Sequence, residues 1–327
     1  MSGPRVVLIS DVFKRQPAAA DMVAEAGFEP VERYELVHRA TAAELLDALG
    51  SAWAVVAGSE RYSRDLIERL PDLHAIARPG VGVDAIDLDA ASRAGIAVLT
   101  TPGANDDSVA DHAIALMLAV LRKLAQHDAA VRAGHWRDAP TGRDLTGLRV
   151  GILGLGAIGR AVARRLVGFR CELAATDPAP DAAFCREMGI ELVDIDELAA
   201  RSDVLTVHTP LLETTRALVN ADVLALLPVG AILVNTSRGP VVDEVALIDA
   251  LRRRSLAGAG IDVFAREPMP ADHPLARLDN VVLTGHVASL SEQGISRLAK
   301  ATIANLVSLA SATGMALPVA PVEAGGG

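Results

Sequence analysis

Three glycines near the middle of the chain have the spacing of a phosphate-binding turn. They follow an apolar run at 150–153 and precede an apolar, arginine-bearing run at 161–166. A strand, a glycine-rich turn and a helix in this order predict a dinucleotide site. The first glycine permits the tight turn, the second lets the backbone approach a pyrophosphate, and the third lets the helix pack on the strand. The helix then points its free amides at the phosphates. The motif residues are Gly154, Gly156, Ala157, Ile158 and Gly159.

An aspartate stands where the second strand of such a site would end. Asp177 follows an apolar run at 171–176, about twenty residues after the glycines. A carboxylate at this place accepts hydrogen bonds from the adenosine ribose hydroxyls and repels a 2′-phosphate. Pro178, Ala179 and Pro180 come next, and no arginine stands beside Asp177 to bind such a phosphate. We therefore predict NAD rather than NADP. The alternative is that Asp177 only caps a strand end.

Polar side chains also follow four later predicted strands. In a doubly wound sheet, the carboxyl ends of the strands form the rim that faces the ligand crevice. One such stretch alone is more simply explained as a turn whose side chain satisfies the backbone. Four in succession behind a nucleotide motif favour a reactive site. They are His208-Thr-Pro210, Asn235-Thr-Ser-Arg-Gly239, Asp262-Val-Phe-Ala-Arg-Glu-Pro268 and Thr284-Gly-His286.

With these motifs the chain resembles the NAD-dependent D-isomer-specific 2-hydroxyacid dehydrogenases, and within them the phosphoglycerate dehydrogenase-like branch. The resemblance covers nearly the whole chain. Besides the motifs above, it rests on Gly80-Val-Gly-Val-Asp84 and Ser108-Val-Ala-Asp-His112. It implies an oxidoreductase that interconverts a small D-2-hydroxy acid and its 2-oxo acid.

The resemblance implies Arg238, Glu267 and His286 as the catalytic residues, and their chemistry suits the reaction. Reduction of a 2-oxo acid places negative charge on the carbonyl oxygen, to which a charged imidazole can give a proton. Arg238 supplies a permanent charge and a fixed donor fork for a carboxylate and the polarised carbonyl. Glu267 can hydrogen-bond the ring of His286 and hold it charged. His286 would then be the acid in reduction and the base in oxidation.

The resemblance also implies binding residues. The turn Gly80, Val81 and Gly82 would hold the substrate carboxylate with backbone amides, and Asp262 would contact the nicotinamide amide. Arg78 could serve a phosphorylated substrate. His112 lies within a predicted helix, where a packed histidine is favoured over a catalytic one. The remaining cofactor-binding candidates are Ser108, His208, Thr209, Pro210, Thr215 and Thr236.

Alternating strands and helices must position these residues, which predicts parallel sheets covered on both faces. In the first unit we expect strands at 5–10, 31–36, 52–57, 74–77 and 96–100, and helices at 17–26, from Thr41 to Gly50 and from Ser63. Thr41 and Glu44 have the spacing of a capping box. In the second unit we expect strands at 149–153, 171–176, 190–193, 203–208, 231–235, 258–262 and 281–284.

Two Rossmann-like, doubly wound domains follow from this order. A long helix is predicted at 106–126 and a final helix at 291–313. Because the seven strands before it complete a dinucleotide domain, the final helix should pack on the first unit. The substrate-binding domain, 1–103 and 289–327, is then discontinuous around an NAD-binding domain at 104–288.

Composition excludes several other classes. Of 327 residues, 51% are hydrophobic and 22% charged, which is typical of a globular protein. The net charge of −10 argues against nucleic acid as a partner. We expect no membrane span, because no apolar run is long enough, and no signal peptide, because the first residues lack its pattern. Two cysteines provide neither a disulfide framework nor a metal site. We expect a cytoplasmic protein without a metal.

Some positions depart from the family pattern. Gly285 stands where a proline is usual before the histidine, Pro79 and Ala85 differ around the turn at 80–82, and the stretch 58–62 replaces a more basic pattern. The last difference weakens the case for a phosphorylated substrate, and no regulatory domain is expected after residue 327.

Our first candidate for the substrate is 3-phosphoglycerate, and glyoxylate or hydroxypyruvate is the second. An NAD-sensing, corepressor-like binding protein is the alternative class. The segment 134–144, with Trp136, is either a surface loop or an arm that contacts a second subunit of a homodimer.

Overall fold

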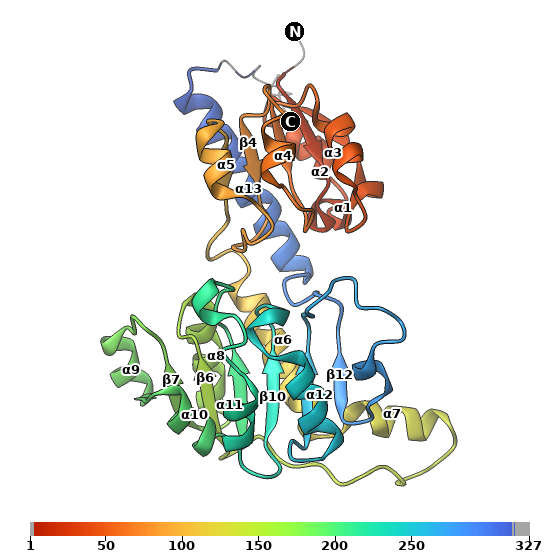
Figure 1. Ribbon diagram of the computed structural model, residues 1–327, viewed down its shortest axis with the longest axis vertical. Coiled ribbons are helices and arrows are strands. Elements are labelled where there is room, and N and C mark those ends of the chain that lie inside the picture. Colours follow the sequence, from red (N-terminus) through yellow and green to blue (C-terminus); the bar gives the residue numbers. More distant parts are fainter. Residues whose placement is uncertain (1–2, 316, 318–327) are drawn as a thin grey trace, which may run out of the picture. The chain divides into compact units, whose positions relative to one another are not determined.

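The computed structural model describes residues 3–315 and Leu317, and it divides into two compact units (Figure 1). Unit one contains the chain up to Asn105 together with the chain from Leu290 onward, and unit two is Asp106–Ser289. In both units all strand pairs are parallel and helices cover both faces of the sheet. The predicted fold class, α/β with two doubly wound parallel sheets, is confirmed.

Unit one has the strand order β2-β1-β3-β4-β5. Alternate residues of its strands point to opposite faces, so Val7 packs with α3, α4 and α5, whereas Val6 and Leu8 pack with α1, α2 and α13. The last helix of the chain thus completes the core of the first unit. The strands are β1 Arg5–Leu8, β2 Glu29–Glu32, β3 Ala54–Val56, β4 Ala75–Ala77 and β5 Ala97–Leu99. The helices are α1 Asp11–Arg15, α2 Ala19–Glu25, α3 Ala42–Leu49, α4 Arg64–Ile67, α5 Leu88–Arg93 and α13 Glu292–Ala312.

Unit two has the strand order β12-β11-β10-β9-β6-β7-β8. Helices α6, α8 and α9 cover one face, and α10, α11 and α12 cover the other. The order reverses between β6 and β9, which places the ligand crevice of such a sheet at their carboxyl ends. The strands are β6 Arg149–Leu153, β7 Glu172–Thr176, β8 Glu191–Leu192, β9 Val204–Val207, β10 Ile232–Asn235, β11 Gly258–Ile261 and β12 Val281–Leu283. The helices are α6 Asp106–Leu121, α7 Leu124–Arg132, α8 Ala157–Gly168, α9 Ala182–Met188, α10 Ile195–Arg201, α11 Ala221–Leu226 and α12 Glu244–Arg252.

The capping box is confirmed: the Thr41 hydroxyl accepts from the Glu44 amide, and the Glu44 carboxylate accepts from the Thr41 amide. Three other expectations were wrong. The second strand ends at Glu32, and 34–36 forms a 3-10 turn after Arg33 leaves the extended region. Helices α1 and α5 were missed because each is short. The single helix expected at 106–126 is divided into α6 and α7, because the backbone at Lys123 has a φ of 55° and interrupts the helix.

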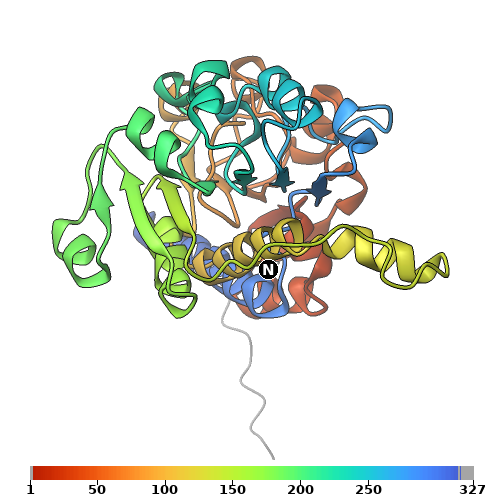
Figure 2. The ribbon, with the colours of Figure 1, turned by 90° about the horizontal axis from the view of Figure 1, so that it is seen from below.

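Helix α7 and the segment after it are the least covered part of unit two. No residue of α7 is buried, and Leu124 and Val131 are more than half exposed. Trp136 is 76% exposed. In Figures 1 and 2 this region, drawn in yellow, extends away from the sheet of unit two. An apolar surface of this kind is typical of a contact with another molecule.

Candidate active site

The glycine turn follows β6 at the point where the strand order of unit two reverses. Gly154 has a φ of 93°, and a Cβ there would lie 2.9 Å from the carbonyl carbon of His208. At Gly159 a Cβ would lie 2.1 Å from the Gly154 oxygen. A Cβ at Gly156 would meet nothing within 4 Å, so the protein itself does not require glycine there. Open space in front of the first turn of α8 is where a pyrophosphate would be bound by backbone amides.

Asp177 lies directly after β7 and already has two partners in the turn. Its Oδ2 accepts from the Leu155 amide at 2.7 Å, and its Oδ1 accepts from the Ala179 amide at 2.8 Å. The carboxylate therefore braces the glycine turn. A carboxylate has about four acceptor positions, so it keeps capacity for ribose hydroxyls. The structure thus shows the strand-end role of Asp177, and its contact with the ribose stays a prediction.

Three predicted cofactor residues present buried polar atoms that have no partner among the described residues. They are the Nδ1 atom of His208 and the hydroxyls of Thr209 and Thr236, which follow β9 and β10. The other nitrogen of His208 lies 2.9 Å from the Thr206 hydroxyl, and burial lowers the pKa of His208 to about 4, so the ring is neutral. Unpaired buried polar atoms are costly. Their concentration at this edge fits a polar ligand such as a dinucleotide.

Three other predicted cofactor residues are placed around the same unit. Ser108 is buried in the first turn of α6. The Thr215 hydroxyl donates to the Pro210 carbonyl at 2.6 Å and accepts from the Leu212 amide at 2.8 Å, so it closes the loop at 210–215. Pro210 itself is exposed. For Thr215 the structure shows a loop-closing role, and contact with the cofactor stays a prediction.

Arg238 follows β10 in a turn that is tied down at both ends. The Asn235 side chain donates to the Arg238 carbonyl and accepts from Ser237. At Gly239 a Cβ would lie 2.0 Å from the carbonyl carbon of Phe264, so the two loops touch through their backbones. The charge of Arg238 is one of several influences that act to lower the pKa of the Glu267 carboxyl.

Glu267 and His286 are joined by a hydrogen bond. Glu267 Oε2 lies 2.7 Å from His286 Nδ1, and Glu267 Oε1 accepts from the Phe264 amide at 3.0 Å. Burial acts to raise the pKa of Glu267, but the hydrogen bond and charge of His286, the Phe264 amide and Arg238 together hold it below its usual range. The carboxylate is therefore charged near neutral pH.

The backbone of His286 is held by Asp262. His286 has a φ of 55°, a region that non-glycine residues rarely occupy. Its amide donates to the Asp262 carbonyl at 2.7 Å. The Asp262 side chain is fully buried and accepts from the amides of Val287 and Ala288 at 2.9 and 3.0 Å. The loop that carries the histidine is thus anchored on both sides, although Gly285 stands where the family usually has proline.

Two side chains behind this loop complete the anchor. The Thr284 hydroxyl donates to Asp262 Oδ1 at 2.6 Å, and His112 Nε2 lies 3.0 Å from that hydroxyl and 3.5 Å from Asp262 Oδ1. Burial acts to raise the pKa of Asp262, but the bonds from His112, Thr284 and the two amides lower it to about 2. Asp262 therefore positions the loop, and its contact with nicotinamide stays a prediction. His112 is packed and hydrogen-bonded, as its place in a helix predicted.

Sequence reasoning missed the roles of Thr284 and Asp262 in supporting the histidine. Asp262 was assigned to the nicotinamide through the resemblance alone. The signal that could have found the anchor is the position of both residues directly after neighbouring parallel strands, β12 and β11, where their side chains must meet. His112 had no such signal, because the register of α6 against the sheet is not written in the local sequence.

The predicted substrate residues lie in unit one. Arg78 follows β4, and its Nε and one terminal nitrogen donate to the carbonyls of Gly82 and Ala57 at 3.1 and 3.2 Å. Gly80 has a φ of 151°, and its carbonyl accepts from the Thr101 amide. Val81 is 45% exposed. Arg78 thus shapes the turn at 80–82, and the binding of a carboxylate there stays a prediction.

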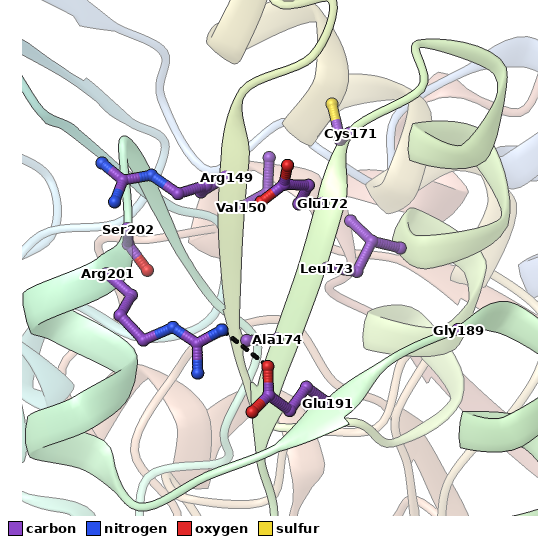
Figure 3. Close-up of a pocket in the computed structure, with 10 residues that line it drawn as sticks. All are labelled: Arg149, Val150, Cys171, Glu172, Leu173, Ala174, Gly189, Glu191, Arg201 and Ser202. Carbon is purple, nitrogen blue, oxygen red and sulfur yellow. Dashed lines mark hydrogen bonds and ion pairs between the residues drawn. The ribbon is translucent and has the colours of Figure 1, made fainter.

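A separate cavity of about 410 Å³ lies at the amino ends of β6 and β7, the end of these strands opposite to the glycine turn (Figure 3). Its two arginines are in ion pairs, Arg149 with Asp203 at 2.9 Å and Arg201 with Glu191 at 2.6 Å. The cavity contains none of the predicted site residues. Within the described part of the chain, no group of three or more His, Cys, Asp or Glu side chains could hold a metal, and no helix is long and apolar enough to cross a membrane.

Comparison with known proteins gives consistent matches. Residues 114–288 match the family model described as the D-isomer specific 2-hydroxyacid dehydrogenase, NAD binding domain. A glyoxylate reductase of Korarchaeum cryptofilum is 42% identical over 74% of this chain and 75% of the relative. A D-3-phosphoglycerate dehydrogenase of Mycobacterium leprae is 38% identical over 94% of this chain, but this chain spans only 57% of that relative. Among solved structures, one match is the crystal structure of an NADPH-dependent glyoxylate/hydroxypyruvate reductase of Sinorhizobium meliloti in complex with NADP and malonate. Its sequence is 34% identical, and the alignment covers 97% of this chain and 96% of the reductase chain with a TM-score of 0.81.

The buried Asp262 carboxylate leads to a prediction for stability. In Asp262→Asn, an amide NH₂ replaces one acceptor oxygen and faces the amides of Val287 or Ala288, which leaves a buried donor unpaired. We expect the free energy of unfolding to fall by about 2–4 kcal/mol at pH 7. Urea denaturation followed by circular dichroism measures this. Asp279→Asn is the control, because Asp279 forms an exposed ion pair with Arg254 and should change stability by less than about 0.5 kcal/mol. Equal effects of the two substitutions would contradict the anchoring role.

Proposed function

The chain belongs to the D-isomer specific 2-hydroxyacid dehydrogenase family, and on this premise we propose that it is an NAD-dependent oxidoreductase that interconverts a small D-2-hydroxy acid and its 2-oxo acid. The observation that carries the proposal is the 2.7 Å hydrogen bond between Glu267 and His286. It lies in the unit that matches the family's NAD-binding domain. An acid–base pair beside a dinucleotide turn is what hydride transfer to a carbonyl requires.

Each side chain has a separate task in this proposal. Bound NADH supplies the hydride. His286 Nδ1 faces Glu267, and Nε2 has no partner among the described residues, so this nitrogen gives its proton to the carbonyl oxygen. Glu267 keeps the ring oriented and favours its charged form. Arg238 provides the fixed positive charge that stabilises the developing oxyanion and the substrate carboxylate. In oxidation, neutral His286 accepts the proton from the hydroxyl.

For the substrate we weigh two candidates. 3-Phosphoglycerate is supported by relatives named D-3-phosphoglycerate dehydrogenase. Glyoxylate or hydroxypyruvate is supported by relatives named for those acids and by one observation in unit one. Two nitrogens of Arg78 donate to backbone carbonyls. Glu60, which is 5% exposed, lies near enough to Arg78 for the arginine charge to affect its pKa. Because these carbonyls occupy two donors of Arg78 and the acidic side chain of Glu60 lies near it, this loop is less suited to a phosphate dianion.

The experiment that tests the proposal is NADH oxidation with a panel of 2-oxo acids. The panel contains glyoxylate, hydroxypyruvate, 3-phosphohydroxypyruvate and pyruvate. We expect turnover with at least one acid and a loss of about 10²–10⁴-fold in His286→Asn, since proton transfer is lost. NADH binding should survive this substitution. Tight NADH binding without turnover on any acid would instead support an NAD-sensing binding protein.

The pairing of Glu267 with His286 predicts the pH dependence of both directions. Reduction needs charged His286, so its rate should hold at low pH and fall as pH rises, whereas oxidation should rise over the same range. In Glu267→Gln the amide still hydrogen-bonds but has no charge to favour the charged ring. The fall in reduction and the rise in oxidation should therefore both move to lower pH. The turnover rates of the two proteins between pH 5 and 10, in both directions, measure this; superimposed profiles would show that Glu267 does not control the histidine.

The preference for NAD over NADP is assigned to Asp177. Because its carboxylate also braces Leu155, we choose Asp177→Asn, which retains one acceptor for that amide. Loss of the charge and of a ribose hydrogen bond should weaken NAD binding by roughly 1.5–3 kcal/mol and narrow its margin over NADP. Titrating both cofactors into wild type and variant, with thermal unfolding as a control for the turn, tests this. Unchanged affinities for both would leave Asp177 only a strand-end role.

We also propose a cytoplasmic homodimer in which α7 and the segment 134–144 contact the second subunit. The exposed Leu124, Val131 and Trp136 supply the apolar surface for this contact. Trp136→Ala removes apolar surface that the second subunit would bury, so it should weaken the dimer at micromolar concentration. Sedimentation of wild type and variant measures the mass. A monomer in wild type, or burial of Trp136 against its own chain, would contradict this assignment.

A further inference from the structure

Glu244 lies at the first residue of α12 and contacts the catalytic loop at two points. Its Oε2 accepts from the Ala265 amide at 3.2 Å, and its Oε1 lies 3.1 Å from His273 Nε2. Only about a fifth of the Glu244 side chain and a sixth of the His273 side chain is exposed, at 21% and 16%. The two contacts lie on either side of Glu267, which is two residues after Ala265 and six before His273.

The proton on His273 is fixed by its second contact. The Leu275 amide donates to His273 Nδ1 at 3.3 Å, where the histidine caps the short helix Pro274–Arg277. An Nδ1 that accepts leaves the proton on Nε2, so the neutral ring donates to Glu244. The carboxylate of Glu244 thus receives one donor from each end of the loop. This arrangement does not involve the proton that His286 transfers.

The first part of the loop between these points, Ala265 to Pro268, is exposed, whereas Met269 packs on the core of unit two and the His273 amide donates to the Pro270 carbonyl. At Ala265 the chain is exposed, and on the inner side the backbone of Gly239 touches Phe264 and Ala265. Because Phe264 also donates to Glu267 Oε1, a shift of this segment moves the carboxylate directly. A displacement of about 1 Å at a catalytic group can cost up to about 100-fold in rate.

We propose that Glu244 is a positioning residue for the Glu267–His286 pair, acting through Ala265 on one side of Glu267 and His273 on the other. It touches neither reacting atom. Its effect is to hold Glu267 where Oε2 meets the imidazole. The kinetic consequence rests on the proposed function, whereas the effect on the His286 ring does not.

The charged groups around the histidine define the test. Glu267 faces Nδ1 of His286, Arg238 lies beside Glu267, and Asp262 with His112 lies behind the loop. None of these is altered by a substitution at Glu244. The lost charge of Glu244 would act on His286 in any background, so a shift that is present in wild type and absent in Glu267→Gln reports the contact with Glu267.

The experiment is the pH titration of ¹⁵N-labelled histidine by NMR, on the whole chain without substrate. The eight histidines are distinguished with His286→Asn and His273→Asn. In Glu244→Gln the amide can accept only one of the two donors, so the loop loosens. We expect the His286 signals to change at lower pH than in wild type, in the same direction as we expect for Glu267→Gln. In the reaction, the reduction rate should fall about 10-fold with unchanged NADH affinity.

Two further variants make the outcome decisive. Asp249→Asn, on the same helix and in an exposed ion pair with Arg253, should leave the His286 titration unchanged. Adding Glu244→Gln to Glu267→Gln should move the titration no further, because both act on one contact. If Glu244→Gln fails to fold, His273→Asn serves in its place, since it keeps a cap for Leu275 but loses the donor to Glu244. Overlay of the His286 titration on wild type would overturn the proposal, and it would do so whether or not any 2-oxo acid is reduced.

Discussion

The buried carboxylate of Asp262 is the interaction on which the site depends. It lies after β11, and it accepts from Thr284 and from the amides of Val287 and Ala288, which follow β12. A buried charge is expensive unless several donors compensate it. Here the donors come from the backbone that carries His286, so the carboxylate is satisfied only when that loop has this conformation. Stability of the anchor and placement of the histidine are thus one physical requirement.

The same carboxyl edge explains why the remaining groups meet. Parallel strands bring their carboxyl ends to one side of the sheet, so the loops after β6, β9, β10, β11 and β12 converge without long connections. Close backbone contacts then set the spacing, as Gly154 does against His208 and Gly239 against Phe264. Two carboxylates in this region, Asp262 and Glu267, both have a lowered pKa, but only Glu267 contacts His286, the proposed proton donor.

Much of this arrangement could be predicted from the sequence. Apolar runs predicted the strands of both sheets, although the second strand was placed too late in the chain, and polar residues after the strands predicted the rim, because both signals are local. What failed was also physical. The break at Lys123 depends on a left-handed residue, which residue type alone does not indicate, and α5 is too short for a periodic pattern. The contacts of His112 and Glu244 join residues far apart in the chain, so no local pattern encodes them.

The conformation of His286 shows how such distant contacts matter. A φ of 55° costs a non-glycine residue of the order of 1–2 kcal/mol, and an isolated loop would relax to avoid it. The amide bond to the Asp262 carbonyl and the ring bond to Glu267 hold the backbone and the side chain separately. Because the backbone and the side chain are both held, Nε2 of the partly exposed ring points in one direction. Loss of either constraint would leave the same residue in the loop, but the proposed proton donor would no longer have a fixed direction.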